Sequence, residues 1–115
     1  MNLLQNYNKY NAQKIEIDGY KFDSTAEGNR YCELKLLQRQ GYIKNLQIHP
    51  KFELQEKFRY EGENYQAIIY KADFMYEEGD KTVVEDVKGF KTKEYLLKKK
   101  MFLKKYGDKY EFRET

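Results

Sequence analysis

Residues 68–89 read IIYKADFMYEEGDKTVVEDVKG, and this stretch decides the fold. Two segments rich in β-branched and aromatic residues flank the turn-forming sequence Glu77-Glu78-Gly79-Asp80, a pattern that predicts a β-hairpin. Each segment carries an acid in an apolar setting, Asp73 in the first and Asp86 in the second, although a strand interior disfavours Asp. Folding at the turn brings the two carboxylates close together.

The alternation of side chains along the second strand places Asp86 and Lys88 on one face, and Glu85 and Val87 on the other. Two carboxylates on neighbouring strands repel each other and lose solvation unless a divalent cation lies between them. Mg²⁺ suits such a site, because proteins hold it with one or two carboxylates, several waters and a phosphate. The alternative is a pair of edge acids in ordinary salt bridges with the many lysines.

The chain before this hairpin predicts a shorter hairpin and a helix. Residues 14–22 alternate apolar side chains around Asp18-Gly19, a tight-turn signal. Ser24 through Glu27 has the capping-box spacing that opens a helix, and Gly41 closes it. Extended stretches are expected over residues 43–48, 51–60 and 65–76.

The chain after the hairpin predicts a second helix and a final strand. Thr92 is the expected N-cap, the helix ends at Gly107, and residues 110–113 form the strand. The order of elements predicts a mixed α/β (α+β) fold. We expect a single domain over residues 14–115, preceded by a flexible arm over residues 1–13.

Each helix has a charged residue in or beside its apolar stripe. Glu27 lies beside the inward face of the first helix, and Lys99 falls in the middle of the stripe of the second. That second stripe consists of Tyr95, Leu96, Phe102, Leu103 and Tyr106. Unpaired buried charge is costly, so both groups need partners. Each has a structural alternative: the capping box can satisfy Glu27, and the long stem of Lys99 can carry its ammonium to solvent.

Composition excludes several classes of site. The 115 residues include one Cys and one His, too few for a structural zinc site, and neither a membrane span nor a signal peptide is expected. The net charge of +3 is unevenly spread, because residues 88–105 contain eight lysines and one acid and carry +7. These lysines are either a solvated helix face or the footprint of a phosphate-rich partner.

The order of these features resembles the PD-(D/E)xK nuclease superfamily. An acid on a helix, Asp73 on one strand, Asp86-Val87-Lys88 on the next and a lysine-rich helix follow one another. In particular, the chain resembles a small phage-encoded family of unknown function, itself similar to Holliday-junction resolvases and to the endonuclease subunit of a Tn7-type transposase. The resemblance runs from about Lys9 to the C-terminus, on residues 22–27 with Tyr31, 70–74 and 84–92.

This resemblance implies a restriction-endonuclease-like core, a central mixed β-sheet flanked by two main helices. It implies Asp73 and Asp86 as metal ligands with the Val87 carbonyl, and Glu27 as a helix-borne acid that contacts the metal directly or through water. Lys88 would orient or activate the attacking water. Ala72 stands where the superfamily's name has proline, and Glu85 offers a second register, although only Asp86 has the x-K spacing.

The expected function is a DNA endonuclease dependent on Mg²⁺ or Mn²⁺ and on no small-molecule cofactor, active on branched DNA in phage recombination or replication. It would act as a homodimer in the cytoplasm of a bacterial host. The expected DNA contacts are Lys9, Lys14, Lys91, Lys93, Lys98, Lys99 and Lys100. The alternatives are a non-catalytic DNA-binding module on the same fold and a protein-interaction or assembly factor.

Two further side chains were candidates for chemistry. His49 precedes Pro50 at an apparent strand break, which favours a turn residue over a catalyst. Cys32 lies on the first helix and is expected to be a packed or partly exposed thiol, not a nucleophile.

Overall fold

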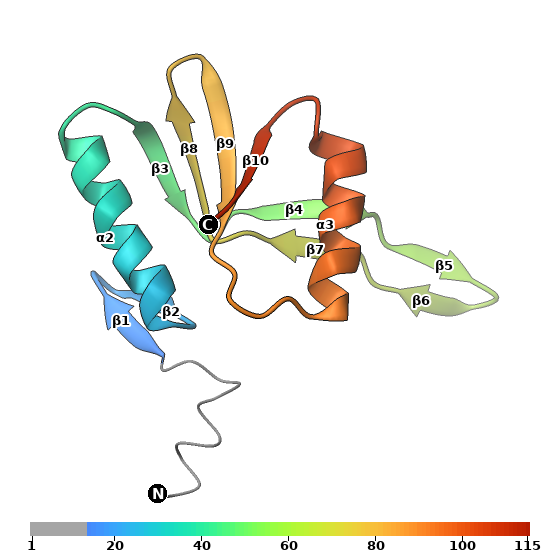
Figure 1. Cartoon of the computed structure of the whole chain (residues 1–115). Helices are drawn as coiled ribbons and strands as arrows, with labels where there is room; N and C mark the ends of the chain where they lie inside the picture. The colour runs from blue at the N-terminus through green and yellow to red at the C-terminus, as the bar shows by residue number, and fades with distance from the viewer. Residues whose placement is uncertain (1–13) are drawn as a thin grey trace, which may run out of the picture.

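A computed structural model describes residues 14–115 and has a mixed α+β fold, as predicted (Figure 1). The expected arm, with Lys9, lies outside the described residues. The helices are α2 (Thr25–Arg39) and α3 (Lys93–Tyr106). The strands are β1 (Ile15–Ile17), β2 (Tyr20–Phe22), β3 (Lys44–Ile48), β4 (Lys51–Gln55), β5 (Phe58–Tyr60), β6 (Glu63–Tyr65), β7 (Ile68–Lys71), β8 (Phe74–Glu78), β9 (Lys81–Asp86) and β10 (Glu111–Glu114).

A four-stranded mixed sheet forms the centre, in the order β10-β9-β8-β3. Strands β8 and β9 form the antiparallel hairpin predicted from residues 68–89, with Phe74 opposite Glu85 and Glu78 opposite Lys81. Strand β3 pairs antiparallel with β8, whereas β10 pairs parallel with β9. The hairpin is therefore the middle of the sheet, and its two ends position the residues described below.

The sheet bends sharply where β3 leads into β4 and β7 leads into β8. Pairing keeps one register through the bend: the His49 N–H donates to the Asp73 carbonyl at 2.9 Å, and the Ala72 N–H donates to the Pro50 carbonyl at 3.0 Å. His49 has a φ of 55°, in the left-handed region, and Pro50 has no N–H to donate. These two residues turn the strand away from the direction of β3.

The extended stretches expected over residues 51–60 and 65–76 are each divided in the structure. The first divides into β4 and β5, and the second runs through the end of β6, then β7 and β8. Asp73 lies in the break between β7 and β8, not in a strand interior, because the chain bends there.

The two helices cover opposite faces of the sheet. Phe74, Tyr76 and Val83 pack in one apolar cluster with residues of α2, whereas Val84 and Met75 belong to a second cluster with residues of α3. This is the flanked sheet expected for the fold. The predicted N-caps are confirmed, since the side-chain oxygens of Ser24 and Thr92 accept from the N–H groups of Glu27 and Tyr95. In the predicted α3 stripe, Leu96 and Leu103 are exposed.

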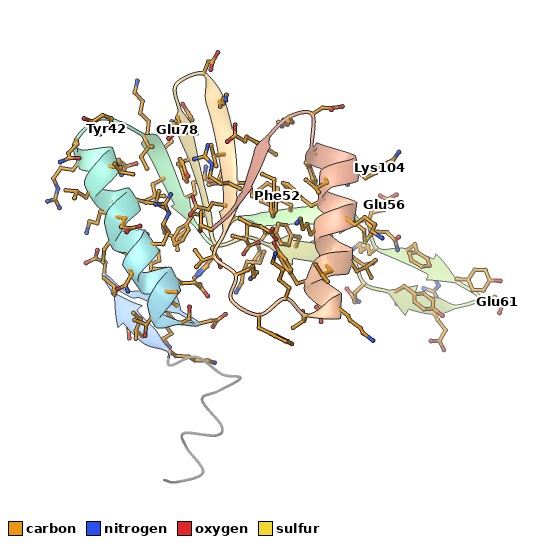
Figure 2. The ribbon with its side chains drawn as sticks, viewed as in Figure 1. Tyr42, Phe52, Glu56, Glu61, Glu78 and Lys104 are labelled. Carbon is orange, nitrogen blue, oxygen red and sulfur yellow. The ribbon has the colours of Figure 1, made fainter. Side chains whose placement is uncertain are left out.

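Strands β5 and β6 form a separate ribbon that projects beyond α3, with Glu61 near its tip (Figures 1 and 2). Glu61 and Gly62 both have positive φ, which closes a tight turn. Phe58 and Tyr65 stack across the ribbon with ring centroids 4.9 Å apart, and both are exposed. Within residues 14–115, no helix is long and apolar enough to cross a membrane.

Candidate functional site

Carboxylates from three elements converge at the bend of the sheet. Asp73 lies in the bend itself, Asp86 is the last residue of β9, and Glu27 stands in the first turn of α2. Asp73 Oδ2 accepts a hydrogen bond of 2.7 Å from the Val87 N–H, which fixes it beside the end of β9. Lys88 Nζ lies 3.1 Å from Asp86 Oδ1, so the D-x-K spacing places amine and acid together as alternation predicted.

All three carboxylates are buried, and two of them, Asp86 and Glu27, have oxygens without a hydrogen-bond partner within residues 14–115. Asp86 is 1% exposed, Glu27 6% and Asp73 7%. Neither Asp86 oxygen, nor Glu27 Oε1, has a hydrogen-bond partner within residues 14–115, and the nearby Lys88 does not reach Asp86 with hydrogen-bond geometry. A buried carboxylate without partners is destabilising. Oxygen donors are what Mg²⁺ and Mn²⁺ prefer, so the residues present fit a hard divalent cation.

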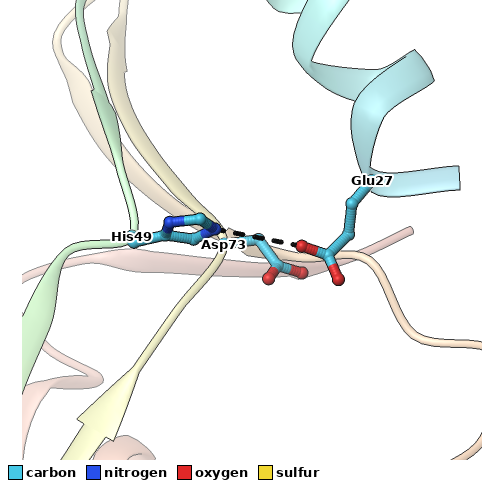
Figure 3. Close-up of side chains that lie close together, drawn as sticks. All are labelled: Glu27, His49 and Asp73. Carbon is cyan, nitrogen blue, oxygen red and sulfur yellow. Dashed lines mark ion pairs between the residues drawn. The ribbon is translucent and has the colours of Figure 1, made fainter. Parts of the chain in front are cut away.

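The carboxylate of Glu27 does not serve the helix cap. Ser24 Oγ accepts from the Glu27 N–H at 3.1 Å, so the cap of α2 uses the backbone of Glu27 and not its side chain. The Glu27 side chain points instead toward His49 and Asp73, as Figure 3 shows. The capping box, proposed above as the structural alternative for this acid, therefore leaves its Oε1 atom unexplained.

Burial raises the pKa values of all three acids, and the charge of Asp73 adds to its effect on Glu27. Burial, reinforced by the charge of Asp73, raises the pKa of Glu27 to about 8. Burial likewise raises the pKa of Asp86 to about 6, against the opposing charge of Lys88. The pKa of Asp73 is raised by burial, although the Val87 N–H favours its ionised form. Groups with perturbed pKa values that cluster in this way are typical of functional sites.

Lys88 stays charged beside these acids. Burial lowers its pKa, but the charges of Asp86 and Asp73 outweigh burial and raise the pKa overall. Its ammonium lies 4.8 Å from the centre of the Tyr95 ring, a cation–π contact from α3. The Tyr95 hydroxyl donates to Glu114 Oε2 at 2.5 Å, which holds the ring in place. Lys88 is thus positioned by both the sheet and the second helix.

Glu85, the neighbour of Asp86, has the opposite environment. It is fully buried and accepts two hydrogen bonds from Arg30, at 2.6 and 3.1 Å, one from the Tyr76 hydroxyl and one from Thr115. Burial raises the pKa of Glu85, but the hydrogen bonds from Arg30, Tyr76 and Thr115 and the charge of Arg30 together outweigh burial and lower the pKa overall. Glu85 is therefore satisfied as a structural ion pair between β9 and α2, whereas Asp86 has only the ion pair with Lys88 and no hydrogen bond within residues 14–115. No pattern in the sequence points to Arg30, because its partner Glu85 is 55 residues away.

His49 also belongs to this corner, although the sequence favoured a turn residue. It is a turn residue with positive φ, and its Nε2 atom lies 4.0 Å from Glu27 Oε1 (Figure 3). Burial, followed by the charge of Lys71, lowers the pKa of His49, which favours the neutral imidazole. The position of His49 beside Glu27 and Asp73 depends on its pairing with Asp73 across the bend, which the sequence does not show. Cys32 is exposed, within the range expected for it.

The predicted DNA-contacting lysines divide into two groups. Lys99 and Lys91 lie 3.0 and 3.4 Å from Glu114 Oε1, and Lys98 lies 3.1 Å from Glu94, so these three have acidic partners within the chain. Lys14, Lys93 and Lys100 are exposed. A groove of about 610 Å³ runs beside the corner, and its lining includes His49, Lys14, Lys21 and Lys71 together with Glu16 and Asp23.

Comparison with known proteins gives a family. The sequence profile of the family described as "Protein of unknown function (DUF1064)" matches residues 7–113. The chain belongs to this family. No curated protein matches the chain. The description of this family names no activity, so a function for the corner has to be inferred from its residues.

Proposed function

We propose that this chain is a metal-dependent DNA endonuclease of the PD-(D/E)xK type. The observation that carries the proposal is Asp86, which is 1% exposed with neither oxygen hydrogen-bonded within residues 14–115, and which lies beside Lys88. A buried acid of this kind is costly to the fold. Its position next to two further buried acids, Asp73 and Glu27, supports a site for a divalent cation.

Each residue of the corner has a role in phosphodiester hydrolysis. Asp73 and Asp86 would hold Mg²⁺ or Mn²⁺ with the Val87 carbonyl, and Glu27 would contact it directly or through water. When bound, such an ion supplies Lewis-acid stabilisation of phosphate charge and a bound water of lowered pKa. Lys88, held between Asp86 and the Tyr95 ring, would orient the attacking water and offset negative charge that develops on the phosphate.

The surroundings of the corner suit a polyanion. The groove beside His49 carries Lys14, Lys21 and Lys71, and Lys93 and Lys100 are exposed on the following helix. Clustered lysines of this kind bind phosphates by releasing counterions. We propose branched DNA of phage recombination or replication as the substrate, in the bacterial cytoplasm, with a homodimer supplying one site for each strand.

Cleavage of a labelled four-way junction and of a linear duplex of the same sequence tests this function. Wild type should cut in Mg²⁺ or Mn²⁺, not in EDTA, and should cut the junction faster. Asp73→Asn should reduce cleavage to background, whereas Asp80→Asn, an exposed acid on the turn of the same hairpin, should cut like wild type.

The outcomes separate the remaining functions. Salt-dependent DNA binding without metal-dependent cleavage would replace the endonuclease with a non-catalytic DNA-binding module on the same fold. Absence of both binding and cleavage would favour a protein-interaction factor. Equal cleavage by wild type and Asp73→Asn, both folded, would show that the site is wrongly assigned.

A further inference from the structure

His49 is the single histidine of the sequence, and it stands directly opposite Asp73 in the bend of the sheet. Its backbone N–H donates to the Asp73 carbonyl, and its Nε2 atom lies 4.0 Å from Glu27 Oε1. That separation is too long for a hydrogen bond. One ligand atom each from Glu27, His49 and Asp73 lies within 4.8 Å of the others, and the three side chains point toward one another (Figure 3).

The three side chains form a built site. Glu27 is 6% exposed, and its Oε1 atom, which faces the imidazole, has no hydrogen-bond partner within residues 14–115. The His49 ring contacts the buried ring of Phe22, with centroids 5.7 Å apart, and its backbone is set by the bend. Its side chain is 25% exposed and lines the groove of about 610 Å³, which gives an entry path.

The ligand types of this trio differ from those of an all-oxygen site. Two carboxylates and an imidazole offer two oxygen donors and one nitrogen donor. Mg²⁺ takes oxygen ligands almost exclusively, whereas imidazole suits first-row transition-metal ions, whose affinity for such ligands rises from Mn²⁺ to Cu²⁺ and falls again at Zn²⁺. Asp86 is not within the group whose ligand atoms lie this close together.

We propose that Glu27, His49 and Asp73 form a metal centre with one nitrogen ligand, which selects Mn²⁺ or another first-row transition-metal ion over Mg²⁺. This inference deepens the proposed function and rests on it for the use of the ion, with Asp86 and Lys88 at the border of the centre. It changes the expected ligand set, because His49 takes a position that the sequence resemblance did not assign. The imidazole nitrogen of His49 is the reason for expecting a transition-metal ion at this centre.

Metal binding without DNA tests this centre. Calorimetric titration of the full chain, free of any histidine tag, should show tighter binding of Mn²⁺ than of Mg²⁺. His49→Asn should weaken Mn²⁺ binding by at least about tenfold, the lower end of the loss that even an indirect metal contact causes. Asn suits this variant because it tolerates a left-handed backbone, and equal unfolding midpoints in EDTA would show that the fold is kept.

Electron spin-echo modulation of bound Mn²⁺ gives a second, direct readout. Because the sequence has one histidine, a ¹⁴N imidazole coupling in wild type that disappears in His49→Asn assigns the ligand. Asp80→Asn, the exposed control, should keep the coupling. Mn²⁺ binding without a nitrogen coupling, no Mn²⁺ binding, or equal affinity in wild type and His49→Asn would overturn the centre.

The test separates this inference from the proposed function. A chain that cuts DNA with Mg²⁺ but shows no imidazole coupling retains the endonuclease and loses the nitrogen ligand. A chain that shows the coupling but cuts no DNA retains the metal centre and loses the endonuclease.

Discussion

Two adjacent acids on β9 have opposite hydrogen-bond environments. Glu85 is held by Arg30, Tyr76 and Thr115, whereas Asp86 has no hydrogen-bond partner within the described chain. Adjacent strand residues face opposite sides of a sheet, so one acid meets α2 and the other meets the corner. The x-K spacing in the sequence pointed to Asp86. The role of Glu85 as the buried partner of Arg30 depends on a contact between α2 and β9, which only the structure reveals.

Glu27→Gln should stabilise the chain at alkaline pH. The pKa of Glu27 is raised from 4.5 to about 8 in the folded protein, so the folded state keeps a proton that the unfolded chain releases. Stability therefore falls as pH rises from about 4.5 to about 8, and the neutral amide removes this loss. We expect a gain on the order of 1–2 kcal/mol in unfolding free energy at pH 8, and none near pH 4.

Urea unfolding at pH 4, 6 and 8 in EDTA measures this effect. Glu56→Gln, an exposed acid, is the control and should follow the pH dependence of wild type. A Glu27→Gln variant that is less stable than wild type at pH 8 would show that the Glu27 carboxylate contributes to the fold.

At the scale of elements, the Arg30–Glu85 pair joins α2 to β9. Breaking a buried ion pair on one side leaves an uncompensated charge, so Arg30→Met should lower the unfolding free energy by about 3–5 kcal/mol. The exposed pair between Lys98 and Glu94 spans one turn of α3, and Lys98→Met should cost less than about 1 kcal/mol. Chemical denaturation of the two variants compares them, and equal losses would be incompatible with a buried tie between helix and sheet.

The β5–β6 ribbon should contribute little to the core. Phe102, on the inward face of α3, is fully buried among aromatic rings, whereas Phe58 is 46% exposed on the ribbon. Phe102→Ala should cost about 3–5 kcal/mol, as large-to-small core substitutions do. Phe58→Ala should cost less than about 1 kcal/mol. Thermal unfolding of both variants checks this ranking, and a larger loss from Phe58→Ala would place the ribbon within the folding core.

Local signals predicted the elements better than their pairing. Turn sequences gave both the 14–22 hairpin and the β8–β9 hairpin, and Ser24 and Thr92 capped the helices as expected. The strand break at His49-Pro50 was expected, but its pairing with Ala72 and Asp73 was not, because those residues lie far along the chain. For the same reason Arg30 could not be matched to Glu85, which is 55 residues away.

At the scale of the whole molecule, the α+β fold gathers buried acids and an amine at one corner. The predicted acids Glu27, Asp73 and Asp86 and the amine of Lys88 do gather there, and the bend adds His49. The basic segment after β9 that the charge count revealed is partly engaged, since Glu114 lies beside both Lys91 and Lys99. The net charge of +3 therefore does not reveal that many lysines lie at the surface while several acids are buried at the corner.

Nicking of supercoiled DNA by wild type and Asp86→Asn, each purified in EDTA, tests the central claim most directly. After Mn²⁺ or Mg²⁺ is added, wild type should convert the supercoiled form to the nicked form, and Asp86→Asn, with an unfolding midpoint at least equal to that of wild type, should leave it intact. Equal nicking by the two folded proteins, or no nicking by wild type in either metal, would contradict an endonuclease centred on this corner.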